Sequence, residues 1–374
     1  MKKVNFYNIS KLNKKYEKNF IKNFKKINKA GRYVIGDYVK KFETSFANYC
    51  NAKYCVAVGN CLDAIKLSFM AYKILGKLKN GDEVLVPANT YIASILGITS
   101  VNLKPIFVEP EPETFNISVE NIKKSINKKT KAILVVDLYG HPADLFAIKK
   151  IAKKKNLKII EDAAQSCGAR INNKMIGSIS DTTCFSFFPG KNLGAFGDGG
   201  AVTTNNKKLY NIIKSLRNYG ESVFENLKDR KYKNIYKGVN SRMDEIQAAI
   251  LIDKLKDYSK YQKIRKKIAN FYLKNIKNSK IILPKLNKNV EHAWHLFVVK
   301  CKFRDKLKKF LETNKIETMI HYPLPPHKQI AFEEFNKKNF HTTEKIYKEI
   351  LSLPIFPTLK QSEILRVVKV INKF

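Results

Sequence analysis

Short apolar runs alternate with helical patterns from about residue 55 to residue 205, and this alternation restricts the fold more than any other feature. The runs are Cys55–Gly59, Glu83–Pro87, Pro105–Glu109, Ala132–Leu138, Leu157–Asp162, Thr182–Phe188 and Gly200–Thr204. Helical patterns such as Leu62–Gly76, Ser118–Lys128 and Asp144–Lys155 lie between most of them. Continuous β-rich runs separated by helices are typical of a mostly parallel sheet with both faces covered. The pattern therefore predicts a three-layer α/β domain.

A different pattern begins near residue 240. Met243–Ile276 has the apolar spacing of one long helix. After it come a strand candidate at Trp294–Cys301, a helix at Asp305–Asn314 and a strand candidate at Ile316–Tyr322. A chain of 374 residues is long enough for two domains. We expect a large domain over residues 1–250, including the N-terminal segment, and a small α+β domain over 251–374.

The net charge of +39 suggests a polyanionic partner, but the composition argues against nucleic acid. The basic residues are 63 Lys and only 8 Arg, and the lysines are spread over the whole chain. A nucleic-acid-binding regulator would need clustered charge and the paired donors of arginine. Lys, Asn and Ile share A/T-rich codons, which is the simpler explanation of the excess.

Other classes of protein are excluded by equally simple observations. No apolar run approaches the 18 or so residues that cross a membrane, and the N-terminus lacks the apolar core of a signal peptide. We therefore expect a cytoplasmic protein. The six cysteines show no metal-binding spacing, so reduced and mostly buried thiols are expected, with no metal site.

The segment FSFFPGKNLGAFGDGGAV (185–202) leads an apolar strand into a glycine-rich turn that contains Lys191. Burial lowers the pKa of a lysine and frees its amine as a nucleophile, so Lys191 is a candidate Schiff-base lysine. A lysine extending from a surface turn is the alternative. The segment alone does not decide between the two.

Two further loops are predicted at the same edge of the sheet, where ligands of α/β proteins bind. In IIEDAAQS (159–166), Asp162 could face the ring nitrogen of pyridoxal phosphate (PLP), and Gln165 could reach the ring hydroxyl. GNCLDAIKL (59–67) opens directly into a helix whose free N–H groups favour a phosphate. The plainer alternatives are helix capping by Glu161 or Asp162 and an ordinary strand-to-helix turn.

The chain resembles the DegT/DnrJ/EryC1/StrS aminotransferases, a family of PLP-dependent sugar aminotransferases with the aspartate-aminotransferase fold (PLP fold type I). Ten segments match in order: GRYVIGDYVKKFE (31–43), VGNCLDAIKL (58–67), GDEVLVPANTYIAS (81–94), VDLYGHPADL (136–145), IEDAAQSCGA (160–169), FSFFPGKNLGAFGDGGAV (185–202), LRNYGE (216–221), GVNSRMDEIQAAIL (238–251), HYPLPPHKQ (321–329) and SLPIFP (352–357). The resemblance implies a three-layer αβα large domain, a smaller α+β C-terminal domain, and PLP as the cofactor.

The resemblance also implies roles for individual residues around the cofactor ring. Lys191 matches the lysine that forms a Schiff base with PLP. Asp162 matches the partner of the ring nitrogen, and Gln165 matches the residue that contacts the ring hydroxyl. Tyr91 matches an aromatic residue that stacks on the ring.

Further matches concern the cofactor phosphate. Ser186 matches a serine that binds it, and Cys61 and Leu62 match the helix-start pair whose backbone amides hold it. Asn240 matches a residue that the partner subunit donates to the same phosphate. The resemblance therefore implies a homodimer with two shared active sites.

The substrates implied by the resemblance are L-glutamate and a nucleotide-linked keto sugar. Arg242 matches a cation near the carboxylate of the amino donor, and His321 and Tyr322 match a strand that approaches the sugar. Lys191 would move the proton as general base and acid, and the products would be 2-oxoglutarate and an amino sugar.

Within the family, the chain is most similar to the branch that converts dTDP-3-oxo-6-deoxyhexoses into dTDP-3-amino-3,6-dideoxyhexoses, on the basis of GN-x-LDA, PANTYIA and HYP-x-P-x-H-x-Q. Cys61 stands where Gly is usual, and Asp137 stands where His is usual, a change expected to bear on sugar recognition. The alternative is a 4-aminotransferase acting on a UDP-4-keto sugar. A sugar dehydratase on the same scaffold would carry His in place of Lys191, so the lysine argues against it.

Overall fold

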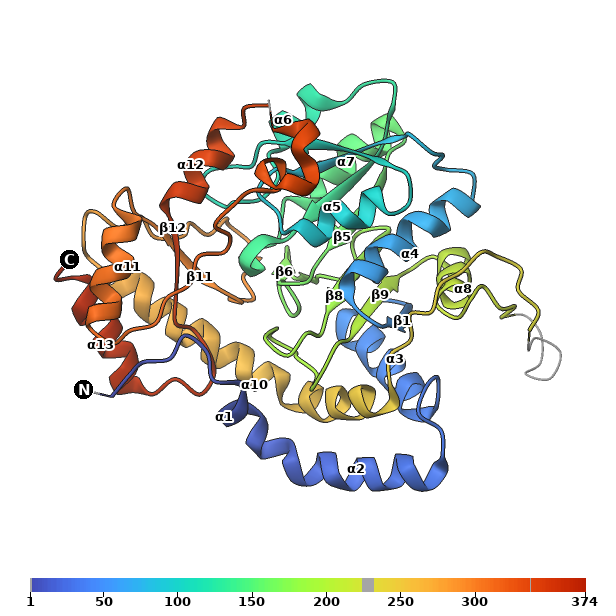
Figure 1. Ribbon diagram of the computed structural model, residues 1–374, viewed down its shortest axis with the longest axis horizontal. Helices are drawn as coiled ribbons and strands as arrows, with labels where there is room; N and C mark the ends of the chain where they lie inside the picture. Colours follow the sequence, from blue (N-terminus) through green and yellow to red (C-terminus); the bar gives the residue numbers. More distant parts are fainter. Residues whose placement is uncertain (1, 224–231, 337) are drawn as a thin grey trace.

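A seven-stranded sheet forms the centre of the computed structural model, which describes residues 2–223, 232–336 and 338–374 (Figure 1). The strands, in spatial order, are β1 (Tyr54–Val58), β9 (Gly200–Thr204), β8 (Thr182–Ser186), β5 (Lys158–Asp162), β4 (Thr130–Val136), β2 (Glu83–Pro87) and β3 (Lys104–Val108). Only β9 runs antiparallel to its neighbours β1 and β8. The predicted, mostly parallel sheet is confirmed, and each predicted run contributes one of its strands.

Both faces of the sheet are covered because alternate residues of each strand point to opposite sides. In β4, Ile133 and Val135 face one core, and Ala132 and Leu134 face the other. The helices of the first core are α3 (Asp37–Cys50), α6 (Val119–Ser125), α7 (Leu145–Lys155) and the first half of α10 (Glu245–Asn275). Those of the second are α4 (Cys61–Ile74), α5 (Ile92–Thr99) and α8 (Lys207–Leu216). The predicted αβα layers are confirmed.

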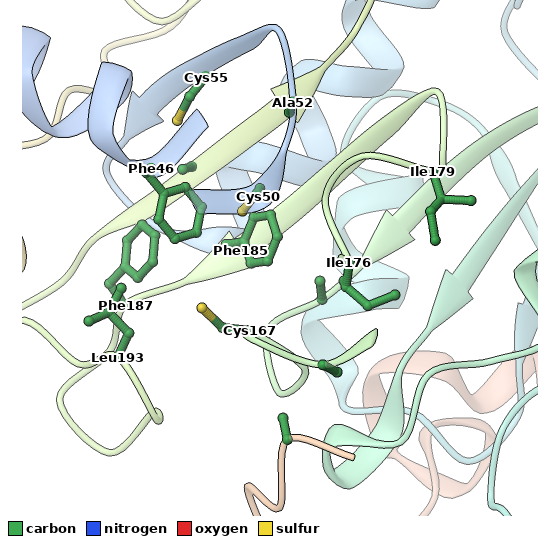
Figure 2. Close-up of a cluster of buried hydrophobic side chains, with 14 of the residues drawn as sticks. Phe46, Cys50, Ala52, Cys55, Cys167, Ile176, Ile179, Phe185, Phe187 and Leu193 are labelled. Carbon is green, nitrogen blue, oxygen red and sulfur yellow. The ribbon is translucent and has the colours of Figure 1, made fainter. Parts of the chain in front are cut away.

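An aromatic cluster in the first core lies directly behind the end of β8 (Figure 2). The rings of Phe185 and Phe187 meet the ring of Phe46 edge-on, at centroid distances of 4.9 and 5.1 Å. Leu193 is fully buried in the same cluster, near Phe187. Leu193, two residues after Lys191, therefore anchors the turn that follows β8 in the core.

The long helix α10 connects this core with a third one (Figure 1). Leu251 and Tyr258 belong to the first core, whereas Ile268 and Tyr272 belong to the third. The third core is completed by β11 (Phe297–Lys300), β12 (Ile350–Leu353), α11 (Arg304–Thr313), α13 (Gln361–Ile371) and Val4. The expected division between residues 250 and 251 falls inside α10, and its position stays a prediction.

The remaining elements complete the described chain. They are α1 (Ile9–Asn13), η1 (Lys14–Tyr16), α2 (Glu17–Ala30), η2 (Leu138–Gly140), β6 (Arg170–Ile171), β7 (Lys174–Met175), β10 (Val290–Glu291), η3 (Pro326–Lys328), η4 (Ile330–Phe335) and α12 (His341–Glu349). The strand predicted at Ile316–Tyr322 is wrong, because the segment changes partners: Ile316 bridges to Val4, and Met319 bridges to Ser352. Two single bridges with different partners do not make a strand.

Three observations bear on the remaining expectations. All six cysteines are free, five of them buried and Cys61 half-buried. Within the described ranges, no three His, Cys, Asp or Glu side chains come together in a way that could hold a metal ion. None of the described helices has both the length and the hydropathy needed to span a bilayer.

Candidate active site

A cavity of about 580 Å³ opens at the carboxyl ends of β4, β5 and β8, beside the first turns of α4 and α5. The three loops that were expected to meet at this edge all contribute to its wall: residues 60–62, residues 162, 164 and 165, and residues 186, 188, 191 and 198. The rest of the wall is mainly apolar or aromatic: Ile65, Thr90, Tyr91, Ile92, Ala93, Leu96, Val136, Leu138 and Tyr322. The predicted convergence is therefore confirmed.

Lys191 lies in the turn after β8 and is half-buried in the cavity wall. Its backbone N–H donates to the carbonyl of Phe188 at 2.8 Å, which closes the turn. Burial lowers the pKa of the amine, and the nearby Asp162 and Cys61 oppose this effect. The amine is thus more easily neutralised than that of a surface lysine, and the alternative of a lysine extending into bulk solvent does not describe it.

Asp162 is the last residue of β5, and its carboxylate is buried. Oδ2 accepts a hydrogen bond from Ser94 Oγ at 2.7 Å, and Oδ1 accepts one from the Ala164 N–H at 3.1 Å. Burial raises the pKa of Asp162, and these hydrogen bonds oppose that shift and orient the carboxylate. Helix capping is excluded as its role, because the described chain makes turns after β5 and next enters β6.

Gln165 has a fixed amide orientation. Its Oε1 accepts from the Tyr139 N–H at 2.6 Å, so its Nε2 is the donor and reaches the Tyr322 hydroxyl at 3.0 Å. The ring of Tyr322 also lies 4.9 Å, centroid to centroid, from the ring of Tyr91. These contacts join the loop after β5 to Tyr91 at the start of α5 and to Tyr322 of the C-terminal part.

The start of α4 presents backbone N–H groups to the cavity. Asn60 caps the helix by accepting from the Asp63 N–H at 2.9 Å. Cys61 and Leu62 are the first two helical residues, whose N–H groups have no acceptor within a helix. Gly200 packs directly against this turn: a Cβ at position 200 would lie 2.4 Å from the carbonyl carbon of Asn60, so only glycine fits there.

Cys61 and Asp137, which depart from the usual pattern, occupy different environments. Cys61 has ordinary helical backbone geometry, so the cysteine is accommodated without left-handed strain, and its Sγ lies 3.8 Å from Asp162 Oδ1. Asp137 is fully buried outside the cavity wall, and its carboxyl accepts from Ser166 Oγ at 2.8 Å. Burial, and then the neighbouring Glu161, raise the pKa of Asp137 well above its usual value. Asp137 does not line the cavity, so no direct contact supports its expected effect on sugar recognition.

Two histidines lie close to Lys191. His321 shares a hydrogen bond of 2.9 Å between Nδ1 and Ser352 Oγ, and burial, then the charge of Lys191, lower its pKa to about 4. Burial and the charge of Lys191 also hold the pKa of His295 well below its usual value. Sequence reasoning missed His295 and Ser94. Ser94 ends the matched segment PANTYIAS, which was its only signal; His295 follows the single tryptophan of the chain and had none.

Asn240 and Arg242 are not among the residues that line this cavity. Asn240 is exposed and bridges to Asn218. Arg242 donates to Asn218 Oδ1 at 3.1 Å, and its guanidinium lies 5.4 Å from the centroid of the Tyr219 ring. The structure therefore gathers most of the other predicted residues around one cavity and leaves Asn240 and Arg242 apart from it. His321 is outside the wall, with its ring centroid 5.6 Å from that of Tyr322.

The groups on the wall suit PLP. An amine of lowered pKa is present for the aldehyde, a buried carboxylate for a protonated ring nitrogen, and an amide donor for the ring hydroxyl. The Ser186 hydroxyl and the start of α4 provide donors for a phosphate. In this arrangement Lys191, Asp162 and Gln165 would hold the ring, and residues 61, 62 and 186 would hold the phosphate.

Comparisons with known proteins agree with this chemistry. The model of the DegT/DnrJ/EryC1/StrS aminotransferase family matches residues 14–372. A dTDP-3-amino-3,6-dideoxy-alpha-D-galactopyranose transaminase of Aneurinibacillus thermoaerophilus is 46% identical over 371 residues, which is 99% of each chain. A UDP-2-acetamido-2-deoxy-3-oxo-D-glucuronate aminotransferase of Pseudomonas aeruginosa is 35% identical, covering 89% of this chain and 90% of its own. The solved structure of S. venezuelae DesV with a ketimine intermediate superposes with a TM-score of 0.94 at 36% identity, covering 100% of this chain and 98% of that one.

Proposed function

The chain belongs to the DegT/DnrJ/EryC1/StrS aminotransferase family, and from this premise we propose that it transfers the amino group of L-glutamate to C3 of a dTDP-3-oxo-6-deoxyhexose. It is a PLP-dependent sugar aminotransferase. The proposal goes beyond the family activity in four respects: the amino donor, the nucleotide, the hexose and the carbon that is aminated.

The observation that carries the proposal is the 46% identity, over 99% of both chains, to a transaminase named for a dTDP-3-amino-3,6-dideoxygalactose. The cavity chemistry supports it. Among the described residues of the wall, Lys191 is the single cation, and Leu96, Ile92 and Phe188 add apolar surface. An uncharged deoxyhexose suits such a wall better than a sugar acid, whose carboxylate would call for a second cation.

PLP, when bound, supplies an electron sink for the charge that develops at the α-carbon of the donor. In the proposed reaction, Lys191 Nζ removes the proton from that carbon, which requires a neutral amine, and the lowered pKa of Lys191 favours that form. Asp162 would hold a proton on the ring nitrogen, with its carboxylate oriented by the donors Ser94 and Ala164.

In the second half of the reaction, Lys191 Nζ delivers a proton to C3 of the sugar, and the oxo oxygen leaves as water. The overall exchange converts glutamate and the keto sugar into 2-oxoglutarate and the amino sugar. Tyr322 lines the cavity beside Gln165 and Tyr91, where it would contact the sugar, and Tyr91 would stack on the cofactor ring.

We further propose that the active unit is a homodimer in which Asn240 and Arg242 serve the cavity of the partner. Asn240 is exposed, and Arg242 has a neutral amide and an aromatic ring as its neighbours, so each remains available for an anionic ligand. In this proposal, Asn240 binds the cofactor phosphate, and Arg242 binds the carboxylate of glutamate.

The experiment that tests the reaction uses ¹⁵N-labelled glutamate with each candidate keto sugar and locates the new C–N bond by NMR. The proposal predicts label at C3 of a dTDP-linked 6-deoxyhexose and no product from a UDP-4-keto sugar. Label at C4, or a clear preference for the UDP substrate, would contradict it and establish the alternative activity.

A further inference from the structure

A second lysine, Lys254 of α10, is buried beneath the turn that carries Lys191. Its Nζ donates to Asn13 Oδ1 at 2.8 Å and to the carbonyl oxygen of Gly194. The same ammonium lies 5.8 Å from the ring centroid of Tyr16 and 5.5 Å from that of Phe196. No carboxylate among the described residues forms an ion pair with it. Burying an ammonium costs free energy unless hydrogen bonds compensate for the lost water. The two acceptors are therefore what stabilises the charge of Lys254.

Gly194 is in direct contact with the turn that precedes Lys191. A Cβ on Gly194 would lie 2.4 Å from the carbonyl oxygen of Pro189, so the two backbone segments are already packed as closely as glycine permits. Pro189 belongs to the turn that the bond from the Lys191 N–H to Phe188 closes. A shift of the Gly194 backbone toward this turn would therefore displace Pro189, two residues before Lys191.

Other contacts hold the ends of the same loop. The Ala195 N–H donates to the Phe187 carbonyl at 2.7 Å, and the Phe196 N–H donates to Gln247 Oε1 at 2.9 Å. Asn192 Nδ2 donates to the Ala293 carbonyl at 2.8 Å. Among these side-chain partners, Lys254 alone is charged, and it binds at the middle of the loop.

We propose that Lys254 is a positioning residue for transamination: its ammonium fixes the Gly194 carbonyl and thereby sets the place of Lys191 Nζ in the cavity. This inference rests on the proposed function. Lys254 is not among the residues of the cavity wall, so it acts on the reaction only through the loop.

The surroundings of Lys254 agree with this role. Burial lowers its pKa to about 8, so the side chain is still mostly an ammonium at neutral pH. Hydrogen bonds from a charged donor in a low-dielectric site are about twice as strong as neutral ones. Asn13 binds the same ammonium, and through it the N-terminal segment is connected to the loop.

The test compares Lys254→Met with Lys256→Met. The second lysine lies on the same helix, but its side chain is 69% exposed and it pairs with Asp253 at 2.8 Å. Hydrogen exchange of the holoenzyme reports the loop directly through the amides of Lys191, Ala195 and Phe196. We expect Lys254→Met to accelerate their exchange about tenfold or more and to lower kcat about tenfold, with KM for the keto sugar changed less than about twofold.

Lys256→Met should leave both the exchange and kcat at wild-type values, and Lys254→Arg, which retains a charged donor, should recover most of kcat. If the methionine variant does not fold, Lys254→Gln replaces it, because its shorter, neutral donor weakens the same contact. The same increase in amide exchange and the same loss of kcat are then expected. Wild-type exchange and wild-type kcat in a folded Lys254 variant would overturn the proposal. The exchange measurement needs no sugar, so a wrong substrate assignment would leave it interpretable.

Discussion

The cavity wall differs from a second group of residues, Asn218, Tyr219, Asn240 and Arg242, in how far one chain completes it. In the wall, Asp162 is fixed by Ser94 and Ala164, and Gln165 is fixed by Tyr139 and Tyr322. In the second group, Asn240 is exposed, and Arg242 contacts Asn218 and Tyr219 outside the cavity. One chain thus gathers the residues expected around the cofactor ring, together with Cys61, Leu62 and Ser186 for its phosphate, whereas Asn240 and Arg242 lie apart from the cavity.

This difference separates two kinds of residue. Those held by buried hydrogen bonds are oriented before any ligand arrives, and removing them should affect the chemical step. Those outside the cavity should act only when a second subunit is present.

Lys191→Ala should lower kcat by at least about 10⁴-fold, because it removes both the nucleophile and the proton carrier. The visible absorption of bound PLP should also change. Lys149→Ala is the control, since that lysine donates to the Ile179 carbonyl and neither residue belongs to the cavity wall. Steady-state turnover and absorption spectra check both variants, and substantial turnover by Lys191→Ala would exclude the assigned mechanism.

Asp162→Asn should lower kcat about 10²-fold, because the neutral amide no longer stabilises a protonated ring nitrogen. Asp137→Asn is the matched control. Burial and Glu161 raise the pKa of Asp137 well above its usual value, so an amide resembles its neutral form. Its kcat should stay within about threefold of wild type. Equal losses in the two variants would show that buried carboxyls matter here only for stability.

Mixed subunits test whether Asn240 acts across an interface. Lys191→Ala and Asn240→Asp chains, each nearly inactive alone, are denatured together and refolded. If Asn240 serves the partner, random pairing restores about a quarter of wild-type activity, because half of the dimers contain one intact site. If Asn240 serves its own chain, no activity returns. Refolding each variant alone provides the control.

His321 should make the protein less stable in acid. Its pKa falls from 6.5 to about 4 on folding, so between these values the unfolded chain binds a proton that the folded chain does not. The free energy of unfolding should therefore decrease as pH falls from 6.5 to 4, by up to about 1.4 kcal/mol per pH unit from this group. Urea denaturation of His321→Gln, compared with wild type, should show a shallower slope. Identical slopes would contradict this.

The sheet and most of the cavity were predictable because their signals are local. Each β-strand of the sheet is an apolar run, and a polar residue such as Asp162 or Ser186 at its carboxyl end has few places to lie except the sheet edge. The resemblance then supplied roles that charge and spacing alone had left open, such as the choice between a surface lysine and a Schiff-base lysine at Lys191.

The rest depended on contacts between distant segments. Ile316–Tyr322 has the composition of a strand, but its partners Val4 and Ser352 lie in different parts of the chain. Nothing near Lys254 in the sequence distinguishes it from the other lysines, since its role comes from Asn13 and Gly194. Burial of His295 beside Lys191 likewise appears only in three dimensions.

The central claim is that one lysine among 63 holds the cofactor. Borohydride reduction of the PLP-loaded protein fixes the cofactor to the amine that binds it, and peptide mass spectrometry then identifies that residue. The account predicts a single modified peptide containing Lys191, with no such peptide from Lys191→Ala. Modification distributed over several surface lysines, with Lys191 unmodified, would contradict it.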